Sequence, residues 1–193
     1  MRINYATDAV IIDESLETVF NFVSRGACYD RWHFDYHLGA QVMDMKEEGV
    51  GSVFSIEELI GGFYLKHVGR VVEFERDRKF VWLGRFAIFP LVWIGTDFTF
   101  GEEASGTRVT ETLYFRMAPW WLLLLPVLGL RPYFRPGACR NHVRDELTGI
   151  KTIIESGDYE PGDITYALED EKLMARVKHI GMQHQPGRGE RPL

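Results

Sequence analysis

The feature that most constrains the fold is a series of six strand-like segments followed by one long helical segment. The strand-like segments have the apolar patterning of strands and are separated by short turns; they cover 38–47, 51–60, 63–75, 78–86, 91–100 and 107–117. Consecutive strands joined by tight turns form an antiparallel meander. A helix is predicted over 138–156, ended by Gly157. The expected fold class is therefore α+β, a curved antiparallel sheet wrapped around a long C-terminal helix.

The segments before the meander complete this arrangement. Residues 5–12 predict a first strand, and apolar residues at helical spacing predict a short helix after it, capped by Asp13 or Ser15 and closed by Gly26. A curved sheet has a concave face that the long helix can cover. We therefore expect a pocket between sheet and helix that binds a small hydrophobic molecule.

The length of 193 residues suits one domain. We expect this domain to cover 1–157, with an apolar insertion at about 118–136. The remaining segment, 158–193, is expected to be a partly disordered extension with one short helix.

Charge and cysteine content exclude several classes of protein. The net charge is −6 and Lys and Arg form no basic stripe in the sequence, so nucleic-acid binding is not expected. Cys28 and Cys139 are too few for a disulfide framework, and we interpret them as small buried hydrophobic residues. The N-terminal sequence has no signal-peptide pattern, so a cytoplasmic location is expected.

An apolar run extends from Ala118 to Leu130 and is interrupted by Pro126. It is shorter than the roughly 20 residues that span a bilayer, so no transmembrane segment is predicted. We expect a lid over the pocket or a self-association contact, such as that of a homodimer. Insertion into a membrane surface is the less favoured alternative, because a net-acidic protein gains little from anionic lipid.

The C-terminal helix carries two polar residues where apolar ones are expected. Its apolar arc is formed by Val143, Leu147, Ile150, Ile153 and Ile154. His142 and Glu146 lie on the edge of this arc, one turn apart, and therefore project in the same direction. A His and a Glu at this spacing can bind a divalent metal. The alternative is an ordinary helical pair at the edge of the core.

The strands add further polar residues that face inward. Alternation over 52–60 places Glu58 in the more uniformly apolar row, although the adjacent Glu57 offers an alternative. The same pattern in the next strand turns His67 inward. Buried carboxylates need a compensating charge. No Lys or Arg falls on these faces, but Arg116 could reach Glu58 from elsewhere, which would leave no need for a cation.

The segment WHFDYH supplies His33 and His37, and spacing does not decide between them. Either one, together with His142, Glu58 and Glu146, completes a set of two imidazoles and two carboxylates. This set suits zinc and would also accept manganese or iron.

With these residues in view, the chain resembles the polyketide cyclase/dehydrase type of the START-like, helix-grip (SRPBCC) superfamily. The resemblance covers roughly 5–156. Its motifs are ESLETVFNFVS, GVGSVFSIEELIGG, VVEFERDRKFVW and NHVRDELTGIKTII. It implies a helix-grip fold that encloses a hydrophobic ligand between sheet and helix.

A narrower similarity is to the diacetylphloroglucinol hydrolase group of this superfamily. Those enzymes use zinc held by two His and two Glu to cleave a carbon–carbon bond in an acylated phenol. The resemblance implies His33, Glu58, His142 and Glu146 as ligands here. This chain is shorter than the hydrolase, has two adjacent acids in the strand motif, and has a second His four residues after His33.

Two functions follow as hypotheses. The first is a metal-dependent hydrolase, lyase or cyclase that acts on an aromatic, polyketide-like molecule. In it Tyr36, His67 or Tyr114 would position a phenol or transfer a proton. The second is a non-enzymatic carrier of a hydrophobic ligand or lipid. Metal content discriminates between the two.

Overall fold

The structure is a computed structural model, and it describes residues 1–26, 28–33, 36–46, 49–60, 63–86, 91–121, 123–124 and 136–159. Most of the predicted extension 158–193 and most of the apolar insertion 118–136 lie outside these residues. The lid, the self-association contact and the C-terminal disorder therefore stay predictions.

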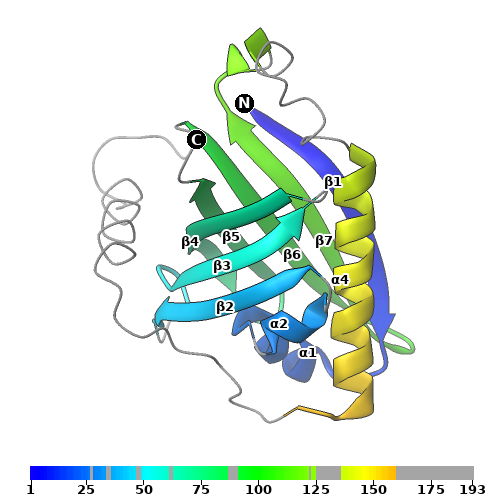
Figure 1. The fold of residues 1–193 in the computed structure, drawn as a ribbon. Coiled ribbons are helices and arrows are strands. Elements are labelled where there is room, and N and C mark those ends of the chain that lie inside the picture. Colours follow the sequence, from blue (N-terminus) through cyan, green and yellow to red (C-terminus); the bar gives the residue numbers. More distant parts are fainter. Residues whose placement is uncertain are drawn as a thin grey trace.

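A seven-stranded antiparallel sheet forms the body of the molecule (Figure 1). Its order is β1-β7-β6-β5-β4-β3-β2, so only β1 pairs with a strand that is distant in sequence. The strands are β1 (Arg2–Ile12), β2 (His37–Asp44), β3 (Val53–Ile60), β4 (Phe63–Glu75), β5 (Lys79–Phe86), β6 (Val92–Glu103) and β7 (Gly106–Met117). The predicted meander is confirmed.

Four register shifts in three strands favour the curvature of the sheet. They lie at Asn4/Ala6 in β1, His37/Gly39 and Val42/Asp44 in β2, and Val71/Glu73 in β4. Such bulges increase local twist and bend the strand that carries them.

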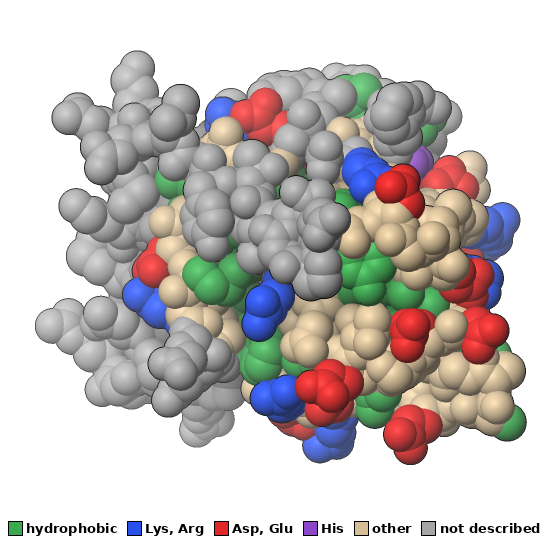
Figure 2. Space-filling model, turned by 90° about the horizontal axis from the view of Figure 1, so that it is seen from below, with side chains coloured by type: hydrophobic (Ala, Val, Ile, Leu, Met, Phe, Trp, Pro, Cys, Tyr) green, Lys and Arg blue, Asp and Glu red, His purple; other side chains and the backbone are tan. Residues whose placement is uncertain are grey.

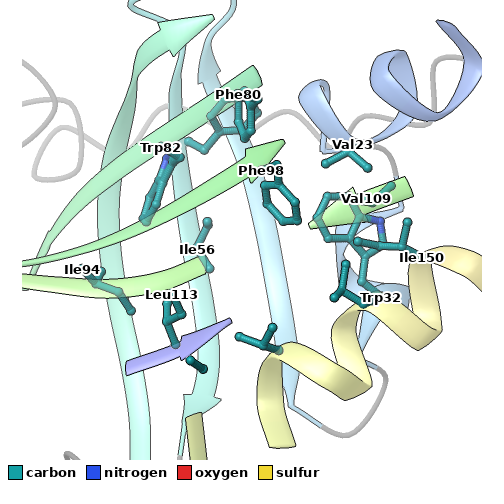
Figure 3. Packing of buried hydrophobic residues seen from close by; sticks show 14 of the residues in the cluster. Val23, Trp32, Ile56, Phe80, Trp82, Ile94, Phe98, Val109, Leu113 and Ile150 are labelled. Atoms are coloured by element: carbon teal, nitrogen blue, oxygen red, sulfur yellow. The ribbon is translucent and has the colours of Figure 1, made fainter. Parts of the chain in front are cut away.

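In the described part of the chain, three helices cover the concave face: α1 (Leu16–Ser24), α2 (Tyr29–Trp32) and α4 (Pro136–Ser156). Ser15 is the N-cap of α1, since its side chain accepts a hydrogen bond from the Thr18 backbone N–H. The five residues of the predicted apolar arc of α4 are all buried in the core (Figure 3 shows Ile150 among them). The sheet wrapped around a C-terminal helix, predicted as a helix-grip fold, is confirmed. In the part of the chain that the structure describes, no helix is long and apolar enough to cross a membrane.

A glycine sets how closely α2 approaches α4. A Cβ atom at Gly149 of α4 would lie 1.7 Å from the carbonyl oxygen of Trp32, the last residue of α2. Any larger residue would push α2 away. Gly149 therefore brings the segment that carries His33 and His37 close to the helix that carries His142 and Glu146.

Candidate metal centre

Five buried polar residues from four parts of the chain meet between the sheet and α4. His142 and Glu146 come from α4, Glu58 from β3, His37 from the first position of β2, and His33 from the residue that follows α2. Each is at most 8% exposed. We call these five residues the His–Glu cluster.

Local backbone structure explains why His33 and His37 meet. The carbonyl of His33 accepts hydrogen bonds from the N–H groups of Tyr36 and His37, so the chain turns between the two histidines. His37 then pairs with Glu58 across β2 and β3. Paired residues of antiparallel strands present their side chains on the same face, and the turn therefore delivers an imidazole beside a carboxylate.

Four atoms of the cluster converge at distances typical of ligands on one ion. Nε2 of His142 lies 3.3 Å from Oε2 of Glu58 and 3.6 Å from Oε2 of Glu146. Nε2 of His37 lies 3.7 Å and 4.0 Å from the same two oxygens. Ligands about 2.1 Å from a tetrahedral zinc ion are about 3.4 Å apart. The set of two imidazoles and two carboxylates therefore fits a divalent ion after small side-chain movements.

His33 is oriented differently from His37. Its Nε2 lies 3.6 Å from Oδ2 of Asp145, which is largely exposed, and its ring lies 4.4 Å from the ring of Tyr36. One nitrogen of each of His33, His37 and His142 lies within 4.8 Å of the others, so His33 remains close to the centre. His37 has distances to both carboxylates that match those of a ligand, and the choice between His33 and His37 stays a prediction.

Neighbouring groups fix the side chains of His37 and Glu58. The backbone carbonyl of Tyr29 lies 2.8 Å from Nδ1 of His37, and the Tyr29 ring stacks on the imidazole. With its proton on Nδ1, His37 presents a lone pair on Nε2, which is buried and has no hydrogen-bond partner among the described residues. Nε2 of His67 lies 3.2 Å from Oε1 of Glu58, on the side away from His37 and His142. Both contacts leave Nε2 of His37 and Oε2 of Glu58 turned toward the centre of the cluster.

Glu111 is a third buried carboxyl group that the sequence analysis missed. It lies on β7, is 1% exposed, and hydrogen-bonds Glu146. Alternation along 107–117 contained the signal, because Glu111 shares its row with Val109 and Leu113, both buried. Two carboxyl groups can hydrogen-bond each other only when one holds a proton, so Glu111 and Glu146 share one.

The protonation states follow from burial and from neighbouring charges. Burial raises the pKa of Glu146 to about 7, and the Glu58 charge adds to this effect. Burial and the neighbouring Glu146 raise the pKa of Glu111 well above its ordinary value. Burial alone would also raise the pKa of Glu58, but the His142 hydrogen bond and the His67 charge lower it to about 2.

The two histidines that face the carboxylates behave differently. Burial lowers the pKa of His37 to about 3, despite the opposing charge of Glu58, so His37 is neutral at pH 7 as a metal ligand must be. Burial also lowers the pKa of His142, but its hydrogen bond to Glu58 and the Glu58 charge outweigh burial and raise it. In the absence of a cation, a His142 proton thus compensates part of the negative charge.

A cavity of about 60 Å³ adjoins the cluster. Glu58, Glu111, Glu146, His67 and His142 line its polar part. The remainder of its wall is almost entirely apolar and mainly aromatic, with Trp32, Phe54, Phe80, Trp82 and Phe98 among the lining residues (Figure 3). The polar groups therefore face an apolar space.

The other candidate residues from the sequence have different places. Tyr36 is 39% exposed and lies beside His33, away from the cavity lining. Tyr114 lies on the outer face of the sheet, under the guanidinium of Arg2. His67 lines the cavity, as the alternation indicated. Glu57 faces outward and binds Lys66, which identifies Glu58 as the inward acid.

The alternative that paired Glu58 with Arg116 is not seen. Among the described residues, the ion-pair partners of Glu58 are His37, His67 and His142. Arg116 pairs in register with Arg2. It follows Tyr114 by two residues on β7, so alternation directs both side chains to the same outer face.

Comparisons with known proteins define the fold. No protein-family model matches the sequence, and no curated protein matches it either. Among solved structures, the di-domain ARO/CYC protein BexL from the BE-7585A biosynthetic pathway is similar over 78% of this chain, with a TM-score of 0.59 and 18% identity. The match covers 49% of BexL, so this chain spans about half the length of that protein.

Two further structures match over nearly their whole length. The KanY protein is similar over 80% of this chain and 99% of its own, with a TM-score of 0.60 and 14% identity. The protein Ara h 8.0201 is similar over 81% of this chain and 99% of its own, with a TM-score of 0.52 and 8% identity. At these identities the similarity concerns the fold. The chain has the helix-grip fold that these solved structures also have.

Proposed function

We propose that the protein is an enzyme that uses a bound divalent metal ion, zinc being the first candidate, to cleave or cyclise a small aromatic carbonyl compound. The observation that carries this proposal is the convergence of four atoms, one each from His37, His142, Glu58 and Glu146, at 3.3–4.0 Å in a buried site. The ion-pair partners of Glu58 among the described residues are imidazoles rather than Lys or Arg, and the Tyr29 hydroxyl donates a hydrogen bond to its Oε2. A divalent cation would neutralise the two carboxylates together.

The residues around this set have distinct roles in the proposal. A bound zinc ion would polarise a carbonyl group and lower the pKa of a water molecule. His67 holds Oε1 of Glu58, so that Oε2 stays directed at His37 and His142. Glu111 holds a proton beside Glu146 and faces the cavity, where it can donate that proton to a substrate oxygen.

The cavity lining supports an aromatic substrate. Most of the wall consists of aromatic and aliphatic side chains, while the acids and imidazoles are confined to one part of it. Such a site binds a flat apolar body and directs a polar group at the reactive residues. The volume of about 60 Å³ is below the roughly 300 Å³ at which ligand sites begin, so substrate entry requires the lining side chains to move.

Metal analysis tests the proposal directly. Protein purified without added metal salts should contain about one equivalent of a divalent metal by inductively coupled plasma mass spectrometry. The variants His142→Ala and Glu58→Gln should lose it. His179→Ala, in the extension outside the described residues, is the matched histidine control and should keep it. Metal-free wild-type protein that takes up no zinc, manganese or iron on titration would refute the metal site.

Turnover is tested separately with diacetylphloroglucinol, the acylated phenol that the resemblance suggests. Deacetylation is followed by liquid chromatography, and it should stop on treatment with a chelator and return on addition of the metal. A metal-loaded protein that binds this compound but leaves it unchanged would exclude carbon–carbon cleavage of this substrate while retaining the metal site.

The carrier hypothesis is supported by the apolar part of the cavity, where nothing reactive lies. A carrier would bind an apolar ligand equally well with or without metal. Ligand affinity measured before and after chelation therefore separates the two functions.

A further inference from the structure

Exposed apolar side chains gather at one end of the molecule. In the described part of the chain, five of the eight exposed large apolar side chains lie there: Met1, Leu91, Trp120, Leu123 and Leu124. They meet because β1 and β6 begin where β7 ends: Met117 hydrogen-bonds Met1 and pairs with Val92. We call these five residues the apolar tip.

The apolar tip is supported by a buried side chain, that of Trp121. Trp120 stacks on Trp121 at a ring distance of 5.0 Å, and Trp121 is buried while Trp120 is 46% exposed. Leu123, one helical turn further on, is 76% exposed. The end of β7, which leads into this segment, lies at the upper end of the view in Figure 1.

A row of arginines crosses the sheet next to the tip. Arg85 of β5 pairs with Trp93 of β6, Trp93 pairs with Arg116 of β7, and Arg116 pairs with Arg2 of β1. Paired residues share a face, and Arg2 lies over Tyr114 on the outer face. We call Arg2, Arg85 and Arg116 the arginine row; Arg2 and Arg116 directly adjoin Met1 and Met117 in sequence.

The charge of this end differs from that of the whole chain. The neighbouring outer-face positions add Arg70 and Lys66, whereas Asp44, Glu57 and Asp97 are the acids of this half of the face, which leaves an excess of two positive charges. The whole chain carries −6. At the far end, acids surround a surface hollow lined by Asp13, Glu14, Glu102 and Glu103. Figure 2, seen from below relative to Figure 1, shows several acidic side chains on the described surface, with basic side chains among them.

We propose that the apolar tip and the arginine row dock the protein on an anionic lipid bilayer. Trp and Leu side chains partition into the boundary between headgroups and acyl chains, and guanidinium groups bind lipid phosphates. The twelve residues of β6 separate the two ends by about 40 Å. Screening at physiological salt acts over about 8 Å. The acids of the far end therefore do not oppose docking, although the net charge of the sequence suggested that they would.

Sedimentation with lipid vesicles tests this surface. The full-length protein should bind vesicles of phosphatidylcholine containing 30% phosphatidylglycerol, bind pure phosphatidylcholine more weakly, and lose affinity at high salt. Arg85→Ala/Arg116→Ala should weaken binding at least tenfold, since each arginine near an anionic surface contributes about fivefold. Arg76→Ala/Arg78→Ala removes the same charge from the distant turn between β4 and β5 and should leave binding unchanged.

The apolar contribution has its own pair of variants. Trp120→Ser/Leu123→Ser should reduce binding to both kinds of vesicle, whereas Met45→Ser/Val50→Ser, which alters exposed apolar residues before β3, should not. Far-UV circular dichroism reports folding in every variant. Equal binding by the test and control variants, or no binding to anionic vesicles, would overturn the proposal. Dimers in light scattering that only Trp120→Ser/Leu123→Ser dissociates would likewise overturn it in favour of a contact between copies.

Discussion

Replacing Glu146 with Gln in the metal-free protein tests the electrostatics of the cluster most directly. Burial and the Glu58 charge raise the pKa of Glu146 from 4.5 to about 7 in the folded state. Each pKa unit corresponds to about 1.4 kcal/mol. The difference in the pKa of Glu146 between the folded and unfolded states therefore corresponds to about 3 kcal/mol of unfolding free energy.

The sign of this pH dependence follows from which state, folded or unfolded, binds the Glu146 proton more tightly. The folded protein binds the Glu146 proton more tightly than the unfolded chain does, so this contribution to stability is complete below pH 4.5. It is lost as the pH rises to about 7, where the folded protein must bury the charge. Gln has no proton to lose. The stability of Glu146→Gln relative to wild type should therefore increase by about 3 kcal/mol between pH 4.5 and 7.

Urea unfolding followed by circular dichroism measures this difference. Both proteins are stripped of metal with a chelator and compared at steps from pH 4.5 to 8. The exposed Glu102→Gln is the matched control and should show no pH-dependent difference from wild type. A difference between Glu146→Gln and wild type that stays constant over this range would refute the reasoning. Adding zinc should reverse the order at pH 7.5, because the ion stabilises only the protein that keeps its carboxylate.

Three further predictions concern the ligands and their support. His142→Ala should abolish metal binding without changing the far-UV circular dichroism spectrum; an unfolded variant would show that the imidazole is structural. His37→Ala should weaken zinc affinity far more than His33→Ala in a competition titration with a chelating dye, and the opposite order would identify His33 as the ligand. Gly149→Ala should destabilise the fold by about 2 kcal/mol in urea unfolding, because the new Cβ meets the Trp32 carbonyl. Helix propensity alone predicts a gain of about 1 kcal/mol, so a stabilised variant would refute the close approach.

Much of the fold follows from patterns that lie within single segments. The apolar arc of α4 predicted which of its residues are buried, and the polar exceptions on its edge, His142 and Glu146, identified the site. Alternation likewise identified Glu58. The same rule applied along β7 would have found Glu111 and would have excluded Tyr114, because residues of opposite parity face opposite sides of a strand. Missing Glu111 and including Tyr114 both came from not applying strand alternation to this segment.

Other features depend on contacts between distant segments and have no local signal. His33 and His37 share one short connection, and only the pairing of β2 with β3 turns His37 toward Glu58. Tyr29 contacts His37 through its backbone carbonyl and its ring, and Glu58 through its hydroxyl, and no local pattern marks these roles. The arginine row requires the register of four strands. Side-chain identity in the sequence therefore revealed the chemistry of the centre, while the choice of ligand required the pairing.

The buried acids bear on the choice between enzyme and carrier. Glu58, Glu111 and Glu146 all line the cavity, and burial opposes the ionisation of each. A carrier of apolar molecules gains nothing from three carboxyl groups in its wall, and apolar residues of similar size would make the metal-free protein more stable. A metal enzyme needs them, because ionised carboxylates bind the cation and a protonated one can serve as an acid. If Glu146→Gln is more stable than the metal-free wild type at pH 7.5 and less stable than the zinc-loaded wild type, this carboxylate serves the cation. If zinc leaves the unfolding midpoint of the wild type unchanged, it does not.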